Sequence, residues 1–325
     1  MEVKMETNFN NQRVLITGAN GFIGSHVVER LVKEKAEVSV IVRESSDLWR
    51  LDEFQKNIDI YKTDLRNLDL LSKTVMQIKP DYIFHCGAYG VDGRQKDFFE
   101  AAQANIFGTM NLIHSLKNIG CKKFINVGTC MEYGNKQKII QEDALLEPDS
   151  IYGSTKASAT IIAHQMAVNY DIDLVTLRPF GVFGEKEGSH KFFPYIILSM
   201  LEDKQVNLTP CEQYRDYCYI ENVVDGFVLA SQNNATKNGI YNIASGDIHK
   251  LKYFVDMINN EMPSSKLPNY GALPYRENEV WRQQPDISKI RNHIKWEPKI
   301  SLQEGIAKTI TWYKQNKHKF IGTTR

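Results

Sequence analysis

The sequence predicts an α/β fold, a doubly wound parallel sheet followed by a smaller C-terminal domain. Short runs rich in β-branched residues alternate with longer amphipathic segments from Arg13 to about Leu177, which is typical of parallel strands joined by crossover helices. A glycine-rich turn directly follows the first run. After Arg178, proline and glycine punctuate the chain and regular units become sparse. We therefore expect one domain over residues 1–178 and a second, mainly substrate-binding one over residues 179–325.

The individual elements follow from the period of the apolar residues. The expected strands are the short runs VLIT, VSVIV, IDIY, DYIFHC, KFINVG and DLVTL. Helices with apolar residues at helical spacing are expected at residues 22–33, 68–78, 98–118 and 152–169. Farther along, residues 222–231 predict a helix and residues 240–244 a strand. We expect the segment from about 215 to 245 to pack back onto the first domain.

Composition excludes several classes of partner. The chain has 325 residues with 40 basic and 39 acidic side chains, so its formal charge of +1 provides no global field for nucleic acid or a membrane surface. Residues 1–11 are polar and no stretch is long enough to span a bilayer, which predicts a cytoplasmic protein. The cysteines lack zinc-type spacing and are expected to be free thiols with no metal site: Cys86, Cys121, Cys130, Cys211 and Cys218.

The glycine-rich turn predicts a dinucleotide site. Its spacing is GxxGxxG, between a buried-type strand and a helix. Glycines let the backbone approach a pyrophosphate, and the helix N-terminus supplies N–H donors. The alternative is a tight strand-to-helix turn without a ligand. The candidate cofactor-binding residues of the turn are Gly18, Asn20, Gly21, Phe22, Ile23 and Gly24.

The ends of the next two strands bear on which dinucleotide is bound. The second strand ends at Arg43, where NAD-binding sites place a carboxylate for the ribose 2′-hydroxyl. An arginine suits a 2′-phosphate, so NADP is favoured and NAD remains open. The adjacent Glu44 would favour NAD if the strand end shifted by one residue. Asp64 and Leu65 follow the third strand and are candidates for the adenine, although Asp64 also suits a helix cap near Asn67.

Tyr152 and Lys156 are the candidate catalytic pair. They stand one turn apart at the start of a predicted helix. An ammonium beside a phenol lowers the pKa of the phenol, which would fit Tyr152 for acid/base chemistry. Thr129 closes an upstream strand and would hydrogen-bond a substrate oxygen at the same sheet edge. The alternative for Tyr152 and Lys156 is an exposed pair without a catalytic role. The alternative for Thr129 is a β-branched residue that only closes a strand.

Several motifs together resemble the extended short-chain dehydrogenase/reductases, and within them the nucleotide-sugar epimerase/dehydratase/reductase group. They are TGANGFIGSH near the start, HCGA at 85–88, NIFGT at 105–109, GTCMEYG at 128–134, YGSTK at 152–156, RPFGVFG at 178–184 and RDYCYIENVVDGF at 215–227. The resemblance spans nearly the whole chain. It implies a Rossmann domain that binds NAD(P) and a nucleoside-diphosphate sugar substrate.

The resemblance also implies residue roles. Tyr152 would be the acid/base, Lys156 its partner and ribose ligand, and Thr129 the hydroxyl beside them. Further cofactor contacts would come from Cys86, Gly87, Ala88, Asn105 and Phe180, and substrate contacts from Tyr89, Cys130, Met131, Arg215 and Arg276. Both arginines would grip the diphosphate, or they form only ion pairs with Asp216, Glu277 or Glu279. The helices at 98–118 and 152–169 resemble the pair that forms a homodimer interface in this family.

Departures from the family pattern narrow the reaction. Dehydratases of the group carry an Asp-Glu pair where this chain has Cys130 and Met131, so dehydration lacks its acid/base. Glu132 would point to the opposite side of an extended strand unless a bulge intervened. Reduction of a 4-keto-6-deoxyhexose by NADPH is then favoured, and 4-epimerisation with tightly bound NAD is the alternative. A ketoreductase for flavonoid- or steroid-type substrates and a catalytically silent NADP-binding regulator also remain open.

Overall fold

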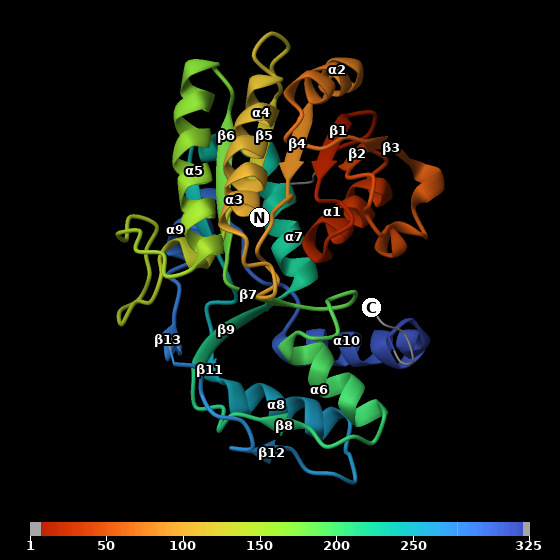
Figure 1. Cartoon of the computed structure of the whole chain (residues 1–325), viewed down its shortest axis with the longest axis vertical. Helices are drawn as coiled ribbons and strands as arrows, with labels where there is room; N and C mark the ends of the chain where they lie inside the picture. Colours follow the sequence, from red (N-terminus) through yellow and green to blue (C-terminus); the bar gives the residue numbers. More distant parts are fainter. Residues whose placement is uncertain (1–7, 278, 321–325) are drawn as a thin grey trace, which may run out of the picture.

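A seven-stranded parallel sheet forms the centre of the molecule (Figure 1), and the order of its strands is β10-β6-β5-β4-β1-β2-β3. The structure is a computed structural model that describes residues 8–277 and 279–320. Residues 1–7 and 321–325, parts of the predicted domains and of the polar start, lie outside the described residues. The sheet strands are β1 (Arg13–Thr17), β2 (Glu37–Val42), β3 (Ile58–Lys62), β4 (Tyr82–His85), β5 (Lys123–Val127), β6 (Leu174–Pro179) and β10 (Ile240–Ile243).

The sheet confirms the predicted doubly wound α/β class. Its strands are short, rich in β-branched residues and almost fully buried, as expected when helices cover both faces. The strand order turns back between β1 and β4, which pair directly. In open sheets of this kind, the crevice at the carboxyl ends beside such a reversal is where ligands bind. The glycine-rich turn begins at that point, immediately after Thr17.

Helices cover the two faces of the sheet. One face carries α2 (Leu68–Ile78), α4 (Gly108–His114) and α5 (Ile151–Asn169), whose buried residues form one core cluster. The other face carries α1 (Phe22–Lys33) and α7 (Ile220–Gln232). The N-terminus of α2 is capped by Asn67, whose side chain accepts from the Leu70 N–H, so the cap that was considered for Asp64 is not made by that residue.

The helix predicted at 98–118 is interrupted. It consists of α3 (Phe98–Ala101), a π-helical segment η3 (Ala102–Phe107) and α4, and it ends at His114. Asn105 sits in the π segment with its side chain 1% exposed and bonded to the Tyr89 backbone and to the Thr155 hydroxyl. π-bulges widen a helix by one residue and commonly occur at functional sites. Here the wider turn accompanies an Asn105 amide directed at the loop after β4.

The C-terminal part is more regular than predicted. Strand β9 (Tyr214–Tyr219) pairs with β7, β11 and β13, and two further strands pair separately. Figure 1 shows this group below the large sheet, together with α6, α8 and α10. The bounds are β7 (Gly181–Phe183), β8 (Asn207–Leu208), β11 (Ile248–Lys250), β12 (Asn269–Tyr270), β13 (Arg282–Gln283), α6 (Phe192–Leu201), α8 (Leu251–Glu261), α9 (Ser288–Ile294) and α10 (Leu302–Asn316). Short 3-10 helices are η1 (Trp49–Leu51), η2 (Gln55–Asn57), η4 (Cys130–Glu132), η5 (Asn234–Thr236) and η6 (Lys317–Lys319).

The segment expected to return to the first domain begins later than predicted. Strand β10 pairs with β6, and α7 packs against α1, so residues from Ile220 to Ile243 include the part that returns to the large sheet. Residues 215–219 instead belong to β9 of the smaller sheet, because β9 takes its partners there. The domain boundary at 178 falls inside β6, between two consecutive residues of one strand. The division of the chain at that point stays a prediction.

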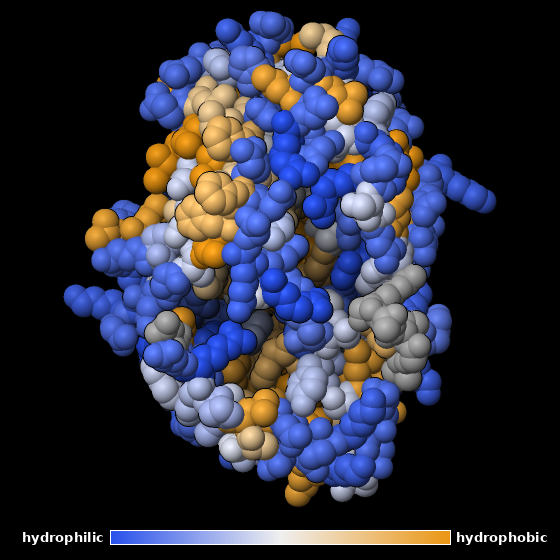
Figure 2. Space-filling model, in the orientation of Figure 1, coloured by the Kyte–Doolittle hydropathy of each residue, from blue (hydrophilic) through white to orange (hydrophobic). Residues whose placement is uncertain are grey.

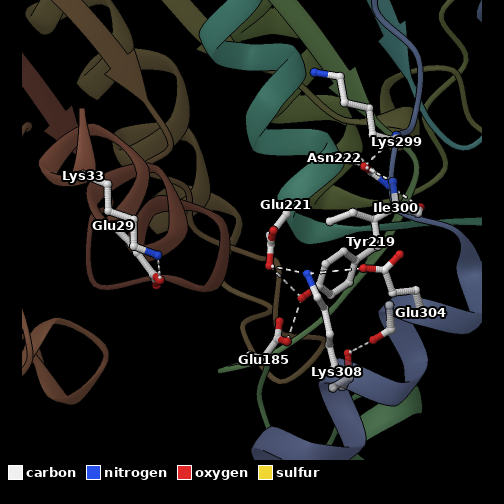
Figure 3. Close-up of polar contacts among 12 residues, drawn as sticks. Glu29, Lys33, Glu185, Tyr219, Glu221, Asn222, Lys299, Ile300, Glu304 and Lys308 are labelled. Atoms are coloured by element: carbon white, nitrogen blue, oxygen red, sulfur yellow. Dashed lines mark hydrogen bonds and ion pairs between the residues drawn. The ribbon is translucent and has the colours of Figure 1, made fainter.

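Buried polar contacts join α7 to the segment that enters α10 (Figure 3). The Asn222 Oδ1 accepts from the N–H groups of Lys299 and Ile300, each at 3.0 Å, and its amide donates to the Ile300 carbonyl at 2.8 Å. The Tyr219 hydroxyl lies 2.7 Å from Glu185 and 3.1 Å from Glu221. Tyr219, at the end of β9, is thereby bonded both to the segment after β7 and to the start of α7.

Candidate active site

The glycine-rich turn brings three backbone segments into close contact. Gly18 has a φ of +65°, and a Cβ there would lie 2.5 Å from the Gly87 nitrogen. A Cβ on Gly24 would lie 2.2 Å from the Gly18 carbonyl oxygen, and the Gly21 N–H donates to that oxygen at 3.0 Å. No side chain caps the start of α1, so its first N–H groups remain available to a ligand. The turn therefore fits the pyrophosphate of a dinucleotide.

Arg50 links the glycine-rich turn to the segment around Lys186 by hydrogen bonds. The sequence analysis did not predict this contact. Its Nε donates to the Lys186 carbonyl at 2.7 Å and its Nη1 to the Asn20 carbonyl at 3.3 Å. Asn20 is also held through its side-chain amide, which donates to the Asp47 carbonyl at 3.2 Å. Arg50 lies in a 3-10 helix between β2 and β3, outside any recognised motif, so only the folded chain reveals this contact.

A cavity of about 130 Å³ lies beside the turn at the ends of β2 and β3. Its lining includes Gly18, Asn20, Arg43, Ser46, Asp64, Leu65, Arg66, Gly87, Ala88 and Tyr89. Arg43 is exposed, and its backbone N–H donates to the Ser46 hydroxyl at 3.1 Å. The Asp64 carboxylate pairs with Arg66 at 2.7 Å, and this hydrogen bond lowers the pKa of Asp64. The sequence analysis did not identify Arg66. Its guanidinium forms an ion pair with the Asp64 carboxylate, which we expected to contact an adenine.

A buried hydrogen-bonded chain supports the loop that follows β4. The His85 Nδ1 lies 2.6 Å from the Thr17 hydroxyl and its Nε2 lies 2.8 Å from the Thr109 hydroxyl. Thr109 donates to the Asn105 carbonyl at 2.6 Å, so His85 donates from Nε2 and Thr17 donates to Nδ1. Burial lowers the pKa of His85 to about 3, which keeps the ring neutral. The Asn105 amide in turn holds both backbone groups of Tyr89, at 2.8 and 2.9 Å.

Two residues that were predicted to contact the cofactor, Asn105 and Phe180, are instead engaged by other residues of the protein. Asn105 spends its amide oxygen and nitrogen on Tyr89 and Thr155, so its contribution to a cofactor site is to fix the loop. Phe180 is 6% exposed and stacks on Tyr133 with ring centroids 6.4 Å apart. Cys86, Gly87 and Ala88 lie in the supported loop, against the glycine-rich turn.

Tyr152, Lys156 and Thr129 come together at the carboxyl end of β5. Ser150 caps α5 by accepting from the Gly153 N–H at 3.1 Å, which places Tyr152 and Lys156 in the first two turns. Burial raises the pKa of Tyr152, and a hydrogen bond with the Thr129 side chain lowers it. Burial lowers the pKa of Lys156, and the Glu132 carboxylate raises it. The effect of Lys156 on the pKa of Tyr152 stays a prediction.

The residues after Thr129 do not continue a strand. β5 ends at Val127, and Thr129 caps the 3-10 helix Cys130–Glu132 by accepting from the Met131 N–H at 3.2 Å. The argument that placed Glu132 on the opposite side of an extended strand therefore does not hold, because strand alternation does not apply to a 3-10 turn. Glu132 is 0% exposed and its Oε2 accepts from the Arg178 Nε at 2.8 Å. The Cys130 thiol accepts from the Gln283 amide at 3.2 Å.

The two candidate diphosphate ligands differ in their surroundings. Arg215 pairs with Glu279 at 3.2 Å and donates to the Tyr214 carbonyl at 2.8 Å, and it acts electrostatically on the Cys130 thiol. Asp216 is turned away and accepts from Ser245 and Gly246, so the alternative pair of adjacent residues is not formed. Arg276 is exposed and has no ion pair within residues 8–277 and 279–320. Arg215 thus lies near the Thr129 turn, and Arg276 lies on an exposed segment.

Glu187 is a buried carboxyl group that the sequence did not single out. Its Oε2 has no hydrogen-bond partner among residues 8–277 and 279–320, and burial raises the pKa of Glu187 to about 8. Because the pKa in the fold exceeds that of the unfolded chain, its stabilising contribution is present below about pH 4.5 and is lost as the pH rises through 8. We expect Glu187→Gln to raise the Tm more at pH 8.5 than at pH 5.5, measured by calorimetry. Glu304→Gln, at an exposed position, is the control, and an equal effect at both pH values would contradict the assignment.

Two features are absent from the part of the chain that the structure describes. No group of three His, Cys, Asp or Glu side chains there has the geometry to hold a metal ion. No helix within the same residues is long and apolar enough to cross a membrane.

Comparisons with known proteins agree with this geometry. Residues 14–244 match the family described as NAD dependent epimerase/dehydratase. The UDP-glucuronate 4-epimerase of Thermodesulfobacterium geofontis is 27% identical over 314 residues, which cover 93% of this chain and 96% of the relative. A UDP-glucose 4-epimerase structure from Thermotoga maritima has a TM-score of 0.86 at 27% identity, over 93% of this chain and 99% of that one. A Bacillus cereus UDP-glucuronic acid 4-epimerase, solved with UDP-glucuronic acid and NAD, has a TM-score of 0.81 at 28% identity, with coverage of 93% and 99%.

Proposed function

This chain belongs to the NAD-dependent epimerase/dehydratase family, and from that premise we propose that it transfers a hydride at C4 of a nucleoside-diphosphate hexose. The observation that carries the proposal is the meeting of Thr129, Tyr152 and Lys156 at the sheet edge that also holds the glycine-rich turn. The nicotinamide cofactor supplies or takes the hydride when it is bound. The residues of the chain bind the sugar, orient it and move one proton.

Tyr152 exchanges that proton with the oxygen on C4. Its burial favours the protonated phenol, so in the reductive direction it is ready to donate to a forming alkoxide. Thr129 hydrogen-bonds the phenol and is placed to share the same substrate oxygen. Lys156 is 2% exposed, and its ammonium is available to a ribose hydroxyl of the cofactor. Arg215, close to the Thr129 turn, is the better placed of the two candidate ligands for the diphosphate.

Dehydration is not part of the proposal. Cys130 and Met131 occupy the turn after Thr129, and burial raises the pKa of the Cys130 thiol to about 12. Elimination of water needs an acid and a base beside C5 and C6, and neither side chain supplies them at neutral pH. The nearby carboxylate of Glu132 is turned into the protein and is bonded to Arg178.

Within hydride transfer, we favour reduction of a 4-keto-6-deoxyhexose by NADPH. The preference for NADPH is supported by Arg43, an exposed residue that lines the cavity at the ends of β2 and β3 together with Ser46. The Asp64 carboxylate, the obvious competitor for a ribose hydroxyl there, is paired with Arg66. An arginine free to fork onto a 2′-phosphate suits NADP.

4-Epimerisation with tightly bound NAD is the second candidate. The relatives described above are 4-epimerases, and one was solved with NAD. The same three residues serve both reactions, since an epimerase performs oxidation and reduction at one carbon. On this comparison the epimerase is supported at least as well as the reductase. A silent regulator is disfavoured because Thr129, Tyr152 and Lys156 are all present and assembled.

One experiment separates these reactions. The purified protein is incubated with nucleoside-diphosphate 4-keto-6-deoxyhexoses and NADPH or NADH, and absorbance of the reduced cofactor is followed. In parallel, nucleoside-diphosphate 4-hydroxyhexoses are incubated without added cofactor, and isomer ratios are measured by NMR. Consumption of the reduced cofactor identifies the reductase. Interconversion without consumption identifies the epimerase, and neither reaction with any sugar would overturn hydride transfer at C4.

The cofactor preference gives a separate prediction. We expect Arg43→Ala to weaken NADPH binding by roughly 10- to 100-fold, because one charge-assisted contact to a phosphate is lost, while NADH binding changes little. Fluorescence titration of the reduced cofactors measures both affinities. Lys62→Ala, at the exposed end of β3, is the matched control for loss of a surface cation. Equal losses for NADPH and NADH would remove the argument for NADP.

We also propose that the chain forms a homodimer through the faces of α3, α4 and α5. Figure 2 shows apolar residues gathered where Figure 1 places these helices. The exposed apolar side chains in this region are Phe98 and Phe99 of α3, Phe107 of the π-helical segment η3, and Ile161 and Val168 of α5. A contiguous apolar surface of this kind marks an interaction site.

Sedimentation velocity tests the dimer. We expect a dimer for the parent chain and a shift to monomer for Phe99→Glu, whose side chain is 82% exposed. Leu267→Glu is the control, because Leu267 is 72% exposed but lies next to β12 in the smaller part. Dissociation by both variants, or by neither, would contradict this interface.

A further inference from the structure

Glu132 is a buried carboxylate that the reaction described above does not use. It is 0% exposed, and its two oxygens accept from different elements. Oε1 accepts from the Thr129 backbone N–H at 2.9 Å, and Oε2 accepts from the Arg178 Nε at 2.8 Å. A side chain at Gly128 would lie 2.6 Å from Oε1, so the glycine before Thr129 leaves room for the carboxylate to fold back under the turn.

The surroundings of Glu132 connect it to the catalytic pair. Lys156 is 2% exposed, its ammonium makes no ion pair or hydrogen bond within the described residues, and it interacts electrostatically with Glu132. Arg178 is fixed on its other side, because its Nη1 donates to the Tyr133 hydroxyl at 2.8 Å and its guanidinium lies 4.6 Å from the Tyr133 ring centroid. Glu132 is thus held between a rigid cation in β6 and the catalytic lysine in α5.

We propose that Glu132 is a positioning residue, which supplies the counter-charge of Lys156 and fixes the Thr129 backbone beside Tyr152. The inference rests on the proposed hydride transfer, because that reaction gives Tyr152, Thr129 and Lys156 their roles. A buried ammonium keeps its proton only if an opposite charge compensates for lost solvation. Glu132 provides that charge without a hydrogen bond to Lys156, so the N–H donors of Lys156 remain available to a ribose hydroxyl.

The pH dependence of the site depends on the charged and titratable groups that interact with Lys156 or Glu132. The groups acting on Lys156 or on Glu132 are Arg178, Cys86, His85, Cys130, Tyr133 and Tyr152. Among them Glu132 is the group that raises the pKa of Lys156 most, and it also raises the pKa of Tyr152. Loss of its charge therefore lowers the pKa of both catalytic groups. The alkaline limb of any activity that needs them must move to lower pH.

The test reads cofactor binding, in a Tyr152→Phe background that removes titration of the phenol. Affinity for reduced cofactor is measured by fluorescence from pH 6 to pH 10. With Glu132→Gln we expect the alkaline loss of affinity to begin about one pH unit lower than with Tyr152→Phe alone. Glu132→Asp retains the charge, so its alkaline limb should stay close to that of the reference. In the Tyr152 enzyme, Glu132→Asp should still lower kcat, because the shorter side chain cannot reach Thr129 and Arg178 together.

Two further variants guard against a merely structural effect. Asp173→Asn breaks another buried pair, in which the carboxylate lies 2.6 Å from Lys123 at the opposite end of β5. It should lower the Tm without moving the pH profile. Glu132→Gln leaves the buried Arg178 without its paired carboxylate, so the double variant Glu132→Gln/Arg178→Met restores charge balance if the single variant fails to fold. The double variant should show the same shifted limb.

An unshifted limb in a folded Glu132→Gln or double variant would overturn the inference, as would an equal shift in Asp173→Asn. Failure of the proposed function is distinguishable, because it would appear as absent sugar turnover by the parent enzyme. The binding measurement needs neither a sugar nor turnover. A loss of affinity without a change in its pH dependence would assign Glu132 a structural role only.

Discussion

Tyr152→Phe is expected to lower turnover by roughly 10²- to 10⁴-fold, the usual contribution of a positioned general acid or base. The substitution removes only the hydroxyl, which hydrogen-bonds Thr129 and exchanges the proton with the sugar oxygen. The ring keeps its packing at the start of α5, where a Cβ added at Gly90 would lie 3.5 Å from the ring atom Cδ2 of Tyr152. Binding of the cofactor should therefore change little, and fluorescence titration beside a turnover assay measures both quantities.

The matched control is Tyr170→Phe, directly after the same helix. Its hydroxyl lies 3.1 Å from the His114 Nδ1 at the far end of α5, so its loss should leave kcat unaffected. If Tyr152→Phe kept more than a tenth of parental kcat, the proton would have to come from another group. Thr129 and Cys130 are the nearest candidates, and burial raises the pKa of the thiol to about 12.

The doubly wound sheet could be predicted because its signals are local. Each strand is a short apolar run, and each helix that was correctly placed carries its own apolar face. The glycine-rich turn could be read for the same reason, since its chemistry lies within seven consecutive residues. The smaller sheet escaped prediction because β8, β12 and β13 have two residues each and pair with distant segments. Helix α6 gave no periodicity because almost all of its residues are apolar.

The site residues that belong to sequence motifs were predicted. The residues whose role depends on contacts in the folded chain were missed. Thr129, Tyr152 and Lys156 were found from spacing, and the structure brings them together. Glu132 was set aside because an extended strand was assumed past Val127, and the chain turns there instead. Arg50 donates to the carbonyl of Lys186, 136 positions away, and Arg66 also bonds Glu100, 34 positions away. Glu187 is buried only because the chain folds around it. No pattern in one sequence encodes such pairings.

Gly18→Ala should abolish most cofactor binding and also lower the Tm. A left-handed backbone costs a non-glycine residue about 1–2 kcal/mol, and the added Cβ would lie 2.5 Å from the Gly87 nitrogen and 2.6 Å from its Cα. Both neighbours are backbone atoms in the loop held by Asn105 and Thr17, so they cannot move independently. Strain and loop displacement together predict a loss of at least about tenfold in affinity, since 1.4 kcal/mol corresponds to a factor of ten.

Gly93→Ala separates this effect from the general cost of removing a glycine. A Cβ at Gly93 would meet nothing within 4 Å, and the residue lies in an exposed turn after the same loop. It should match the parent chain in both Tm and cofactor affinity. If Gly18→Ala bound the cofactor as the parent does, the turn would be only a tight connection between β1 and α1. The pyrophosphate would then have to lie elsewhere along the sheet edge, because α1 offers its uncapped N–H groups only through that turn.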